Sequence, residues 1–322
     1  NVHLLAKDGR LRISATNLDT SVIAFVGASI DEEGVITAPA KLFRDFVTNL
    51  PDDVVTITLD NNFLNVKTAR NSTKINTIPA SEYPEVPTIS PDSESLELDS
   101  LEFSEAVKQV AFAAAPDDSR PVFSGVYLSF TDGVFNIAAS DGFRLSERVL
   151  NLKNLDKPSF SAIVPAKVLL EVSRLLSAQE PTVICFDSHA NLVMFKNEDL
   201  IFGTRIISGQ FPDYKRIIPQ DFSVEVEMLS SDLLSAVKLA DIFAHQVDGS
   251  MKLKIDSAGK ICVSASDPNL GEHTSSFEAS VQGDTLEISI NSKYLLDFLS
   301  NVGCEKICFR TQGSTSPCVF LP

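Results

Sequence analysis

The chain has 322 residues, of which 44% are hydrophobic, and its formal net charge is −16 at pH 7. This length predicts two or three domains with hydrophobic cores. The charge excludes a surface that is basic all round, but it is compatible with a local basic stripe. No apolar run approaches the ~18 residues of a membrane span, and no stretch has the pattern of a signal peptide, so we expect a cytoplasmic protein.

The five cysteines predict neither a metal site nor a disulfide framework. No C-x-x-C pair occurs, and no histidine lies near Cys304 and Cys308 in the sequence, which disfavours zinc. Reduced and mostly buried thiols are the favoured interpretation. We therefore expect no metal and no cofactor.

One short pattern recurs three times along the chain, at residues 38–46, 164–172 and 290–298. In each copy a lysine precedes a mostly apolar run, and Lys41, Lys167 and Lys293 are spaced by 126 residues both times. Equal spacing with similar neighbours rarely arises by chance. The chain is therefore predicted to contain three copies of one unit.

Each unit is expected to combine helices with antiparallel strands. Residues 100–115 and 230–245 have apolar residues at helical spacing, and Ser100 and Ser230 are candidate N-caps. Thr131-Asp132-Gly133 is a candidate hairpin turn. Strands of period two are predicted at residues 55–59, 63–66, 126–130 and 134–137. The predicted fold class is α+β, with two helices packed on antiparallel sheets in each unit.

Proline-rich stretches mark the expected domain boundaries. Residues 84–92 contain three prolines, and residues 212–221 have the same role before the third unit. The predicted domains are residues 1–90, 96–212 and 220–322. Alignment of the units leaves the first without its leading helix and the third without its last strand, so we expect a chain that is clipped at both ends.

Catalytic motifs are scarce. The histidines are scattered, and neither a glycine-rich phosphate loop nor a nucleophile elbow occurs. Asp117, Asp118 and Asp141 are candidate groups for an enzyme with an acidic cleft. The favoured alternative for the pair Asp117-Asp118 is an acidic turn at the end of a helix.

The three repeated helices each carry a charged face. A lysine, a carboxylate and a third polar residue stand at i, i+4 and i+7, namely Lys41, Asp45 and Thr48; Lys167, Glu171 and Arg174; and Lys293, Asp297 and Ser300. One interpretation is a solvated face with local ion pairs. The other places the helices inside an arc, where these lysines and the equivalent Lys108 and Lys238 would attract duplex DNA without regard to its sequence.

Several motifs, taken together and in order, resemble a known family. They are Asp118-Ser119-Arg120-Pro121 with Phe123-Ser124-Gly125, Ser140-Asp141-Gly142-x-Arg144-Leu145, Pro165-Ala166-Lys167, and Gly209-x-Phe211-Pro212-Asp213-Tyr214-x-Arg216. They are similar to the bacterial DNA sliding clamp, the beta subunit of the replicative DNA polymerase, over essentially the whole chain. The resemblance implies three clamp domains that form half of a closed ring, completed by a head-to-tail homodimer around duplex DNA.

The resemblance also implies a function without catalysis. A clamp is a processivity factor that tethers the replicative polymerase and other proteins with a clamp-binding motif, and a separate clamp loader opens it. The family pocket for partner peptides maps to Phe123, Ser140, Gly142, Arg144, Leu145, Pro212, Arg216 and Ile217. Phe143 stands where the family often has histidine, and a C-terminal strand that completes the family pocket is expected to be missing.

Two further surfaces follow from the resemblance. The residues expected to face DNA are Lys41, Arg44, Lys108, Arg120, Lys167, Arg174, Lys238 and Lys293. The dimer contact is expected at Ile75 and Ile78 on one side and at Phe243 and Ala244 on the other. A third hypothesis, beside the clamp and the enzyme, is a repeat scaffold that binds peptides but never DNA.

Overall fold

The structure is a computed structural model that describes residues 1–51, 54–89, 93–117, 119–152, 159–245 and 248–322, and every count below refers to these residues. The described chain divides into two compact units. The first comprises Asn1–Val107, Ser124–Ile137 and Val149–Ser208, and the second comprises Lys108–Phe123, Ala138–Arg148 and Gly209–Pro322. The middle sequence repeat therefore contributes to both units.

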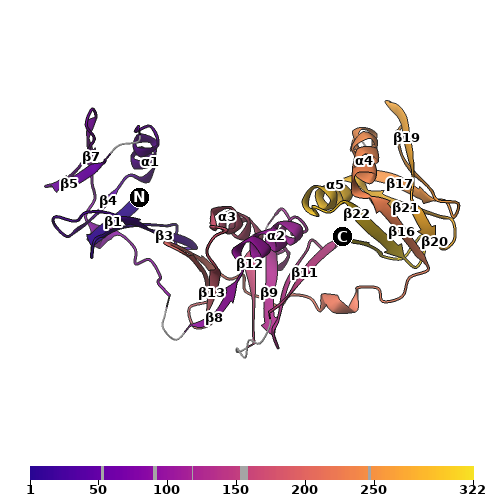
Figure 1. Ribbon diagram of the computed structural model, residues 1–322, viewed down its shortest axis with the longest axis horizontal. Coiled ribbons are helices and arrows are strands. Elements are labelled where there is room, and N and C mark those ends of the chain that lie inside the picture. Colours follow the sequence, from indigo (N-terminus) through magenta and orange to yellow (C-terminus); the bar gives the residue numbers. More distant parts are fainter. Residues whose placement is uncertain (52–53, 90–92, 118, 153–158, 246–247) are drawn as a thin grey trace. The chain divides into compact units, whose positions relative to one another are not determined.

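An antiparallel sheet of eight strands runs through the first unit, in the order β4-β1-β2-β3-β15-β14-β13-β8 (Figure 1). Its strands are β1 (Val2–Lys7), β2 (Arg10–Thr16), β3 (Thr20–Gly27), β4 (Gly34–Ala38), β8 (Glu94–Leu98), β13 (Thr182–Asp187), β14 (Leu192–Asn197) and β15 (Leu200–Arg205). The first and second repeats join where β15 pairs with β3, with Phe202 opposite Val22. The sheet is thus continuous across the two repeats.

The remaining elements of the first repeat build its own core. They are the helix α1 (Ala40–Thr48), the strands β5 (Thr56–Asp60), β6 (Phe63–Lys67) and β7 (Ser72–Asn76), and the short helix η1 (Ala80–Glu82). Phe43 of α1 packs in a cluster with Leu4, Leu64 and Ile75, all buried. Two other apolar residues of α1, Leu42 and Val47, are exposed and lie outside that cluster.

The middle repeat contains a second sheet, in the order β11-β10-β9-β12. Its elements are α2 (Ser100–Ala111), η2 (Pro121–Ser124), β9 (Gly125–Thr131), β10 (Val134–Ser140), β11 (Leu145–Asn151), β12 (Phe160–Pro165) and α3 (Ala166–Leu175). Phe103 of α2 is fully buried, with its ring centroid 5.9 Å from that of Phe195 and 6.4 Å from that of Phe135. Burial of each such side chain stabilises the fold by about 1.5–3 kcal/mol.

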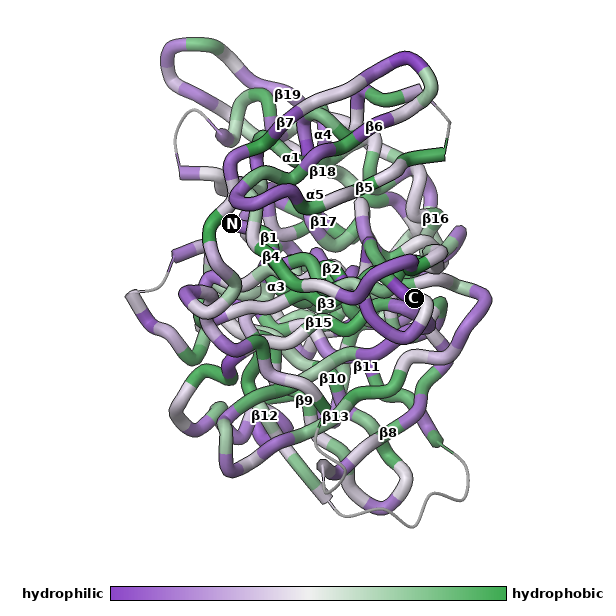
Figure 2. The backbone as a smooth tube through the Cα atoms, turned by 90° about the vertical axis from the view of Figure 1, so that its left-hand side faces the viewer, coloured by the Kyte–Doolittle hydropathy of each residue, from purple (hydrophilic) through white to green (hydrophobic). Residues whose placement is uncertain are grey.

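The third repeat lies entirely in the second unit. Its elements are η3 (Tyr214–Arg216), β16 (Val224–Leu229), α4 (Ser230–Ala244), β17 (Ser250–Ile255), β18 (Lys260–Asp267), β19 (Gly271–Glu278), β20 (Ser280–Gln282), β21 (Leu286–Asn291), α5 (Ser292–Asn301), β22 (Lys306–Thr311) and β23 (Cys318–Leu321). Two sheets, β20-β16-β22-β23 and β19-β18-β17-β21, pack with α4 and α5 around one hydrophobic core. Hydrophobic and hydrophilic residues alternate along many strands (Figure 2), as in the buried and exposed positions of β17.

The predicted hairpins are confirmed, and the predicted N-caps are wrong. Thr131-Asp132-Gly133 closes the β9–β10 hairpin, with φ of 51° at Asp132 and 78° at Gly133, as a primed turn requires. The Ser100 hydroxyl instead donates to the Glu180 carbonyl at 2.5 Å. The Ser230 hydroxyl likewise donates to the Cys304 carbonyl at 2.5 Å. Both serines tie a helix to a distant segment rather than capping it.

The first turn of α2 is capped by a residue that the sequence pattern did not single out. The carboxylate of Asp99 accepts a hydrogen bond from the Glu102 N–H at 2.8 Å, which satisfies one of the donors left open at a helix start. The helix ends at Ala111, earlier than predicted.

Gly125 begins β9 in the tightest surroundings of its motif. A Cβ there would collide with Ile163 Cγ2 and lie 2.9 Å from Ile207 Cδ1. We expect Gly125→Ala to lower the free energy of unfolding by about 1–3 kcal/mol because the strand must shift to admit the methyl group. Urea denaturation followed by circular dichroism measures the change. The matched control is Gly34→Ala, whose Cβ would meet nothing within 4 Å; equal midpoints for both variants would contradict the prediction.

Candidate functional site

The loop between β10 and β11 carries three of the residues expected to bind a partner peptide. The Ser140 hydroxyl accepts the Gly142 N–H at 3.0 Å and donates to the Arg144 carbonyl at 2.7 Å. The Asp141 carboxylate accepts the N–H groups of Phe143 at 2.9 Å and Arg144 at 3.0 Å. Side chains of the loop thus bind its own backbone, which fixes its conformation.

Arg120 joins this loop to η2. Its Nη2 donates to the Asp141 carbonyl at 2.6 Å, and its guanidinium carbon lies 4.9 Å from the centroid of the Phe123 ring. Gly142 faces the same side chain with φ of 91°, and a Cβ there would lie 2.8 Å from Arg120 Nη1. The positive φ favours glycine at this position.

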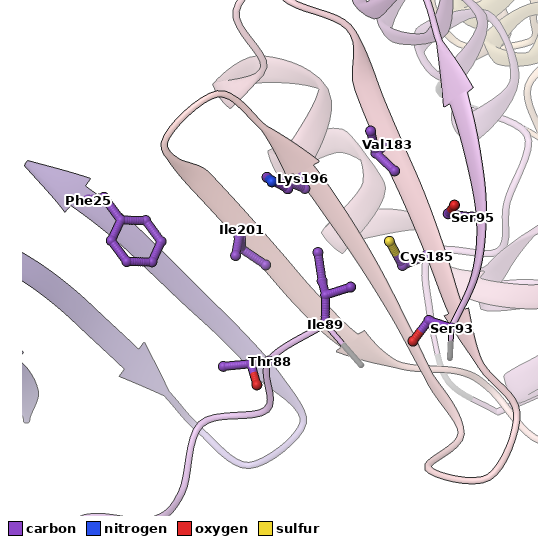
Figure 3. A pocket seen from close by; sticks show the side chains of 9 residues that line it. All are labelled: Phe25, Thr88, Ile89, Ser93, Ser95, Val183, Cys185, Lys196 and Ile201. Atoms are coloured by element: carbon purple, nitrogen blue, oxygen red, sulfur yellow. The ribbon is translucent and has the colours of Figure 1, made fainter. Parts of the chain in front are cut away.

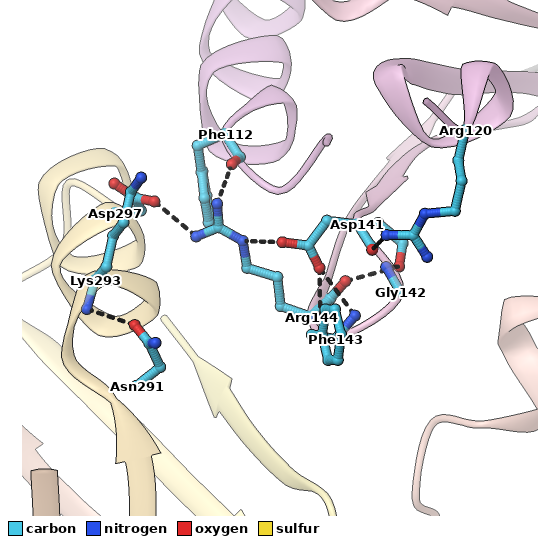
Figure 4. Close-up of polar contacts among 10 residues, drawn as sticks. Phe112, Arg120, Asp141, Gly142, Phe143, Arg144, Asn291, Lys293 and Asp297 are labelled. Atoms are coloured by element: carbon cyan, nitrogen blue, oxygen red, sulfur yellow. Dashed lines mark hydrogen bonds and ion pairs between the residues drawn. The ribbon is translucent and has the colours of Figure 1, made fainter. Parts of the chain in front are cut away.

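The Arg144 guanidinium is the most connected group of the site (Figure 4). It donates from Nε to Asp141 Oδ2 at 3.1 Å, from Nη1 to Asp297 Oδ2 at 2.7 Å and from Nη2 to the Phe112 carbonyl at 2.8 Å. The rings of Tyr294 and Phe112 lie beside it, with centroids 4.6 Å and 5.5 Å from its central carbon. A charge bound in this way is held in one place.

The segment after β15 reaches the same region through aromatic contacts. The Phe123 and Phe211 ring centroids are 6.4 Å apart, and those of Phe211 and Tyr214 are 6.1 Å apart. The Tyr214 hydroxyl donates to Glu147 Oε1 at 2.6 Å. These contacts hold η3 and its neighbours Pro212 and Ile217 in the second unit, where all the residues expected to bind a peptide are found.

Large apolar side chains remain exposed on this region. Phe143 is 81% exposed and Ile217 is 64% exposed, and Leu145 is half-buried. Arg216 is exposed and pairs with Asp213 at 2.6 Å. Exposed apolar side chains among polar groups are typical of a protein-binding surface. We call the eight residues the peptide surface: Phe123, Ser140, Gly142, Arg144, Leu145, Pro212, Arg216 and Ile217.

The repeated helix lysines are exposed and form no ion pair with any other described residue. They are Lys41 on α1, Lys108 on α2, Lys167 on α3, Lys238 on α4 and Lys293 on α5. The predicted i,i+4 pairs of three of these lysines are absent from the described residues, because the carboxylates bind arginines instead. Asp45 pairs with Arg44 at 2.5 Å, Glu171 with Arg174 at 2.7 Å, and Asp297 with Arg144 at 2.7 Å.

Two of the residues expected at a dimer contact are buried in their own units. Ile75 is 2% exposed and Ala244 is 1% exposed, so their side chains belong to the cores and only their backbone could face another chain. Ile78 is 37% exposed, and the Phe243 ring stacks on His273 with centroids 6.1 Å apart. On α4, Leu239 and Ile242 are 47% and 59% exposed, and the sequence pattern did not single them out. No clear signal in the sequence separates them from the buried residues, because α4 carries apolar residues on more than one side.

The carboxylates considered for catalysis are engaged in local structure. Asp117 is exposed and accepts hydrogen bonds from the Ser119 hydroxyl and N–H, which lower the pKa of its carboxyl group. Asp141 is buried and binds two backbone N–H groups and the Arg144 guanidinium. Asp118 lies outside the described residues. Both carboxylates are therefore committed to hydrogen bonds within the protein.

A separate hollow of about 550 Å³ lies in the first unit and contains none of the predicted site residues (Figure 3). It is lined by Phe25, Thr88, Ile89, Ser93, Ser95, Val183, Cys185, Lys196 and Ile201. Burial raises the pKa of the Cys185 thiol, which disfavours the reactive thiolate.

The described residues hold no group of three or more potential metal ligands. The five cysteines are all free. Among the described helices, none is both long and apolar enough to cross a membrane.

Comparison with known proteins places the whole chain against one family. The N-terminal, central and C-terminal domains of the DNA polymerase III beta subunit match residues 1–87, 97–213 and 215–322. The beta sliding clamp of Synechococcus elongatus is 27% identical over 329 residues, which cover 100% of this chain and 87% of that protein. That of Vibrio cholerae is 28% identical over 309 residues, which cover 95% of this chain and 83% of that protein.

Solved structures give the same result. The DNA polymerase III beta subunit of Pseudomonas aeruginosa has a TM-score of 0.93 at 27% identity, covering 99% of this chain and 87% of that one. The beta subunit of Thermotoga maritima has a TM-score of 0.90 at 29% identity, covering 100% and 87%. A structure of the Pseudomonas aeruginosa sliding clamp bound to griselimycin has a TM-score of 0.93 at 27% identity, covering 99% and 86%.

Proposed function

Because the chain belongs to the family of DNA polymerase III beta subunits, the beta sliding clamps, we propose that two copies of it join head to tail into a ring around duplex DNA. The protein is a processivity factor for DNA polymerase III. Each chain would supply half of the ring, with its three clamp domains in sequence. Topological enclosure then replaces tight binding, so a modest cationic lining is enough.

The observation that carries the proposal is the set of unpaired helix lysines. Exposed ammonium groups recur at one position of α1, α3 and α5 and at another position of α2 and α4, in a chain whose net charge is −16. A duplex carries about one negative charge per 1.7 Å of its axis and attracts such groups whatever its sequence. The acidic remainder of the surface would repel DNA. The duplex would therefore be attracted only along the helices that carry these lysines.

The peptide surface is the proposed docking site of the polymerase and of other proteins with a clamp-binding motif. Exposed Ile217 supplies apolar contact, to which the neighbouring exposed ring of Phe143 adds, and Arg144 supplies a fixed cation. The related clamp of Pseudomonas aeruginosa is bound to griselimycin in its structure, and we propose that this chain binds the same compound at the peptide surface. A separate clamp loader would open the ring, and the protein would act in the cytoplasm without catalysing a reaction itself.

A primer-extension assay tests the proposed function. Full-length protein is added to the replicative polymerase and clamp loader of the same organism on a long primed template, with excess competitor DNA so that each polymerase binds once. The proposal expects products at least tenfold longer than without the protein. Product lengths unchanged at saturating protein would contradict it and would favour a scaffold that binds peptides but not DNA.

A further inference from the structure

Arg144 is held by groups from two repeats within the second unit. Asp141 and the Phe112 carbonyl come from the middle repeat, whereas Asp297 and Tyr294 come from α5 of the third. The side chains of Arg144 and Asp297 are 16% and 32% exposed. Partial burial strengthens such an ion pair relative to one at an open surface. The position of the guanidinium therefore depends on how α5 packs against the loop between β10 and β11.

Asp297 differs from its counterparts in the other repeats. Asp45 and Glu171 occupy the same position of α1 and α3, but each pairs with an arginine of its own helix, and these pairs are exposed. Asp297 reaches a residue 153 positions away in the sequence. The same repeated carboxylate thus has a local role in two repeats and a long-range role in the third.

Arg144 keeps hydrogen-bonding capacity that a ligand could use. A guanidinium has five N–H groups, and three of those of Arg144 donate to described acceptors. The other two donate to no described residue, on a side chain that remains 16% exposed within the peptide surface. Carbonyl groups of a peptide are suitable acceptors for these two N–H groups, provided that the guanidinium is held in the orientation that presents the N–H groups to the peptide.

We propose that Asp297 is a positioning residue for the peptide surface, which holds the Arg144 guanidinium from α5 and so couples peptide binding to the packing of the third repeat against the second. The inference rests on the proposed docking of peptides at this surface. Coupling of this kind is reciprocal, so a bound peptide would in turn stabilise the contact of α5 with the loop. Asp297 itself need not touch the peptide.

The test is a double-mutant cycle on full-length protein with griselimycin as the probe, measured by isothermal titration calorimetry. Asp297→Asn preserves the shape of the side chain and removes its charge, and we expect it to raise the Kd roughly tenfold. Asp297→Glu restores the charge and should recover much of the affinity. The matched control, Asp45→Asn, removes the equivalent carboxylate of α1 and should leave the Kd unchanged.

The cycle with Arg144→Lys separates a positioning role from a general structural one. Lysine keeps the charge but not the planar fork of arginine. If Asp297 acts through Arg144, Asp297→Asn should raise the Kd for griselimycin by less than about threefold in the Arg144→Lys background. Urea midpoints of all variants show whether they fold. Should any aspartate variant fail to fold, the comparison of Asp297→Glu with wild type in both backgrounds still tests the same coupling.

Each outcome has a distinct meaning. A wild-type protein that does not bind griselimycin would overturn the proposed peptide surface and the inference with it. Wild-type binding that Asp297→Asn leaves unchanged would overturn the inference alone. If Asp297→Asn also weakened griselimycin binding tenfold in the Arg144→Lys background, the inference would be overturned as well, because Asp297 would then act by another route.

Discussion

Reversing the charge of Lys41, Lys167 and Lys293 together is expected to weaken binding to duplex DNA at least tenfold at low salt. The three lysines are exposed, lie on equivalent helices and form no ion pair with a described residue. In the milder triple variant with alanine, the slope of log K against log salt should become less steep by about 3, since each lost phosphate contact removes about 0.9. Fluorescence anisotropy of a labelled duplex, titrated at several salt concentrations, measures both changes.

The control for this prediction changes the net charge by the same amount. Lys196, Lys254 and Lys260 are exposed on strands and form no ion pair with a described residue. Their reversal to glutamate should change DNA binding less than threefold, because long-range repulsion from distant charges is screened beyond about 10 Å at 0.1 M salt. Equal losses in the two triple variants would mean that total charge, rather than a lining of helix lysines, controls binding.

Introducing aspartate at both Leu239 and Ile242 is expected to convert the proposed dimer of the full-length protein into monomers. These apolar side chains are exposed on α4, next to Phe243, on the helix where the sequence predicts the dimer contact. Losing the burial of two such side chains costs about 1.5–3 kcal/mol each, so the dimer should weaken by roughly a thousandfold. Sedimentation velocity at micromolar concentration measures the mass of the species present.

A second double variant guards against a general effect of surface aspartates. Leu101 on α2 and Leu175 on α3 are 54% and 51% exposed, and neither is expected at the dimer contact. The variant with aspartate at both positions should remain a dimer. If the variant with aspartate at Leu239 and Ile242 remained a dimer and the variant with aspartate at Leu101 and Leu175 dissociated, the interface would lie on the middle repeat rather than on α4.

The repeated elements could be predicted because they depend on local patterns. The spacing of Lys41, Lys167 and Lys293 located α1, α3 and α5, and the turn Asp132-Gly133 located the β9–β10 hairpin. Helical spacing and turn chemistry act within a few residues, so one sequence is enough to detect them. The peptide surface was predicted from motifs whose residues the structure places in one unit.

The failures concern interactions between distant segments. Ser100 and Ser230 have the residue type of an N-cap, but their hydroxyls find carbonyl groups about 80 and 74 positions away. Asp297 was expected to pair with Lys293 one turn before it, and it pairs with Arg144 instead. Local spacing cannot reveal such competition, because the stronger partner is brought near only by tertiary packing.

The dimer contact shows the same limitation on a single helix. Ala244 and its exposed neighbour Ile242 are two residues apart, and only the packing of α4 against β18 and β19 decides which one faces solvent. A helix with apolar residues on more than one side gives no clear buried stripe, so the sequence left this choice open. Leu239 and Ile242 are therefore chosen for substitution because the structure shows them exposed.

Retention on circular DNA distinguishes enclosure of the duplex from ordinary binding to its surface. Full-length protein is loaded by its clamp loader onto a nicked plasmid, and the complex is isolated by gel filtration in about 0.5 M salt, which suppresses simple electrostatic binding. We expect the protein to elute with the circle and to be released within minutes after a single cut makes the DNA linear. Protein that never elutes with the circle, or that stays bound equally well after the cut, would contradict enclosure.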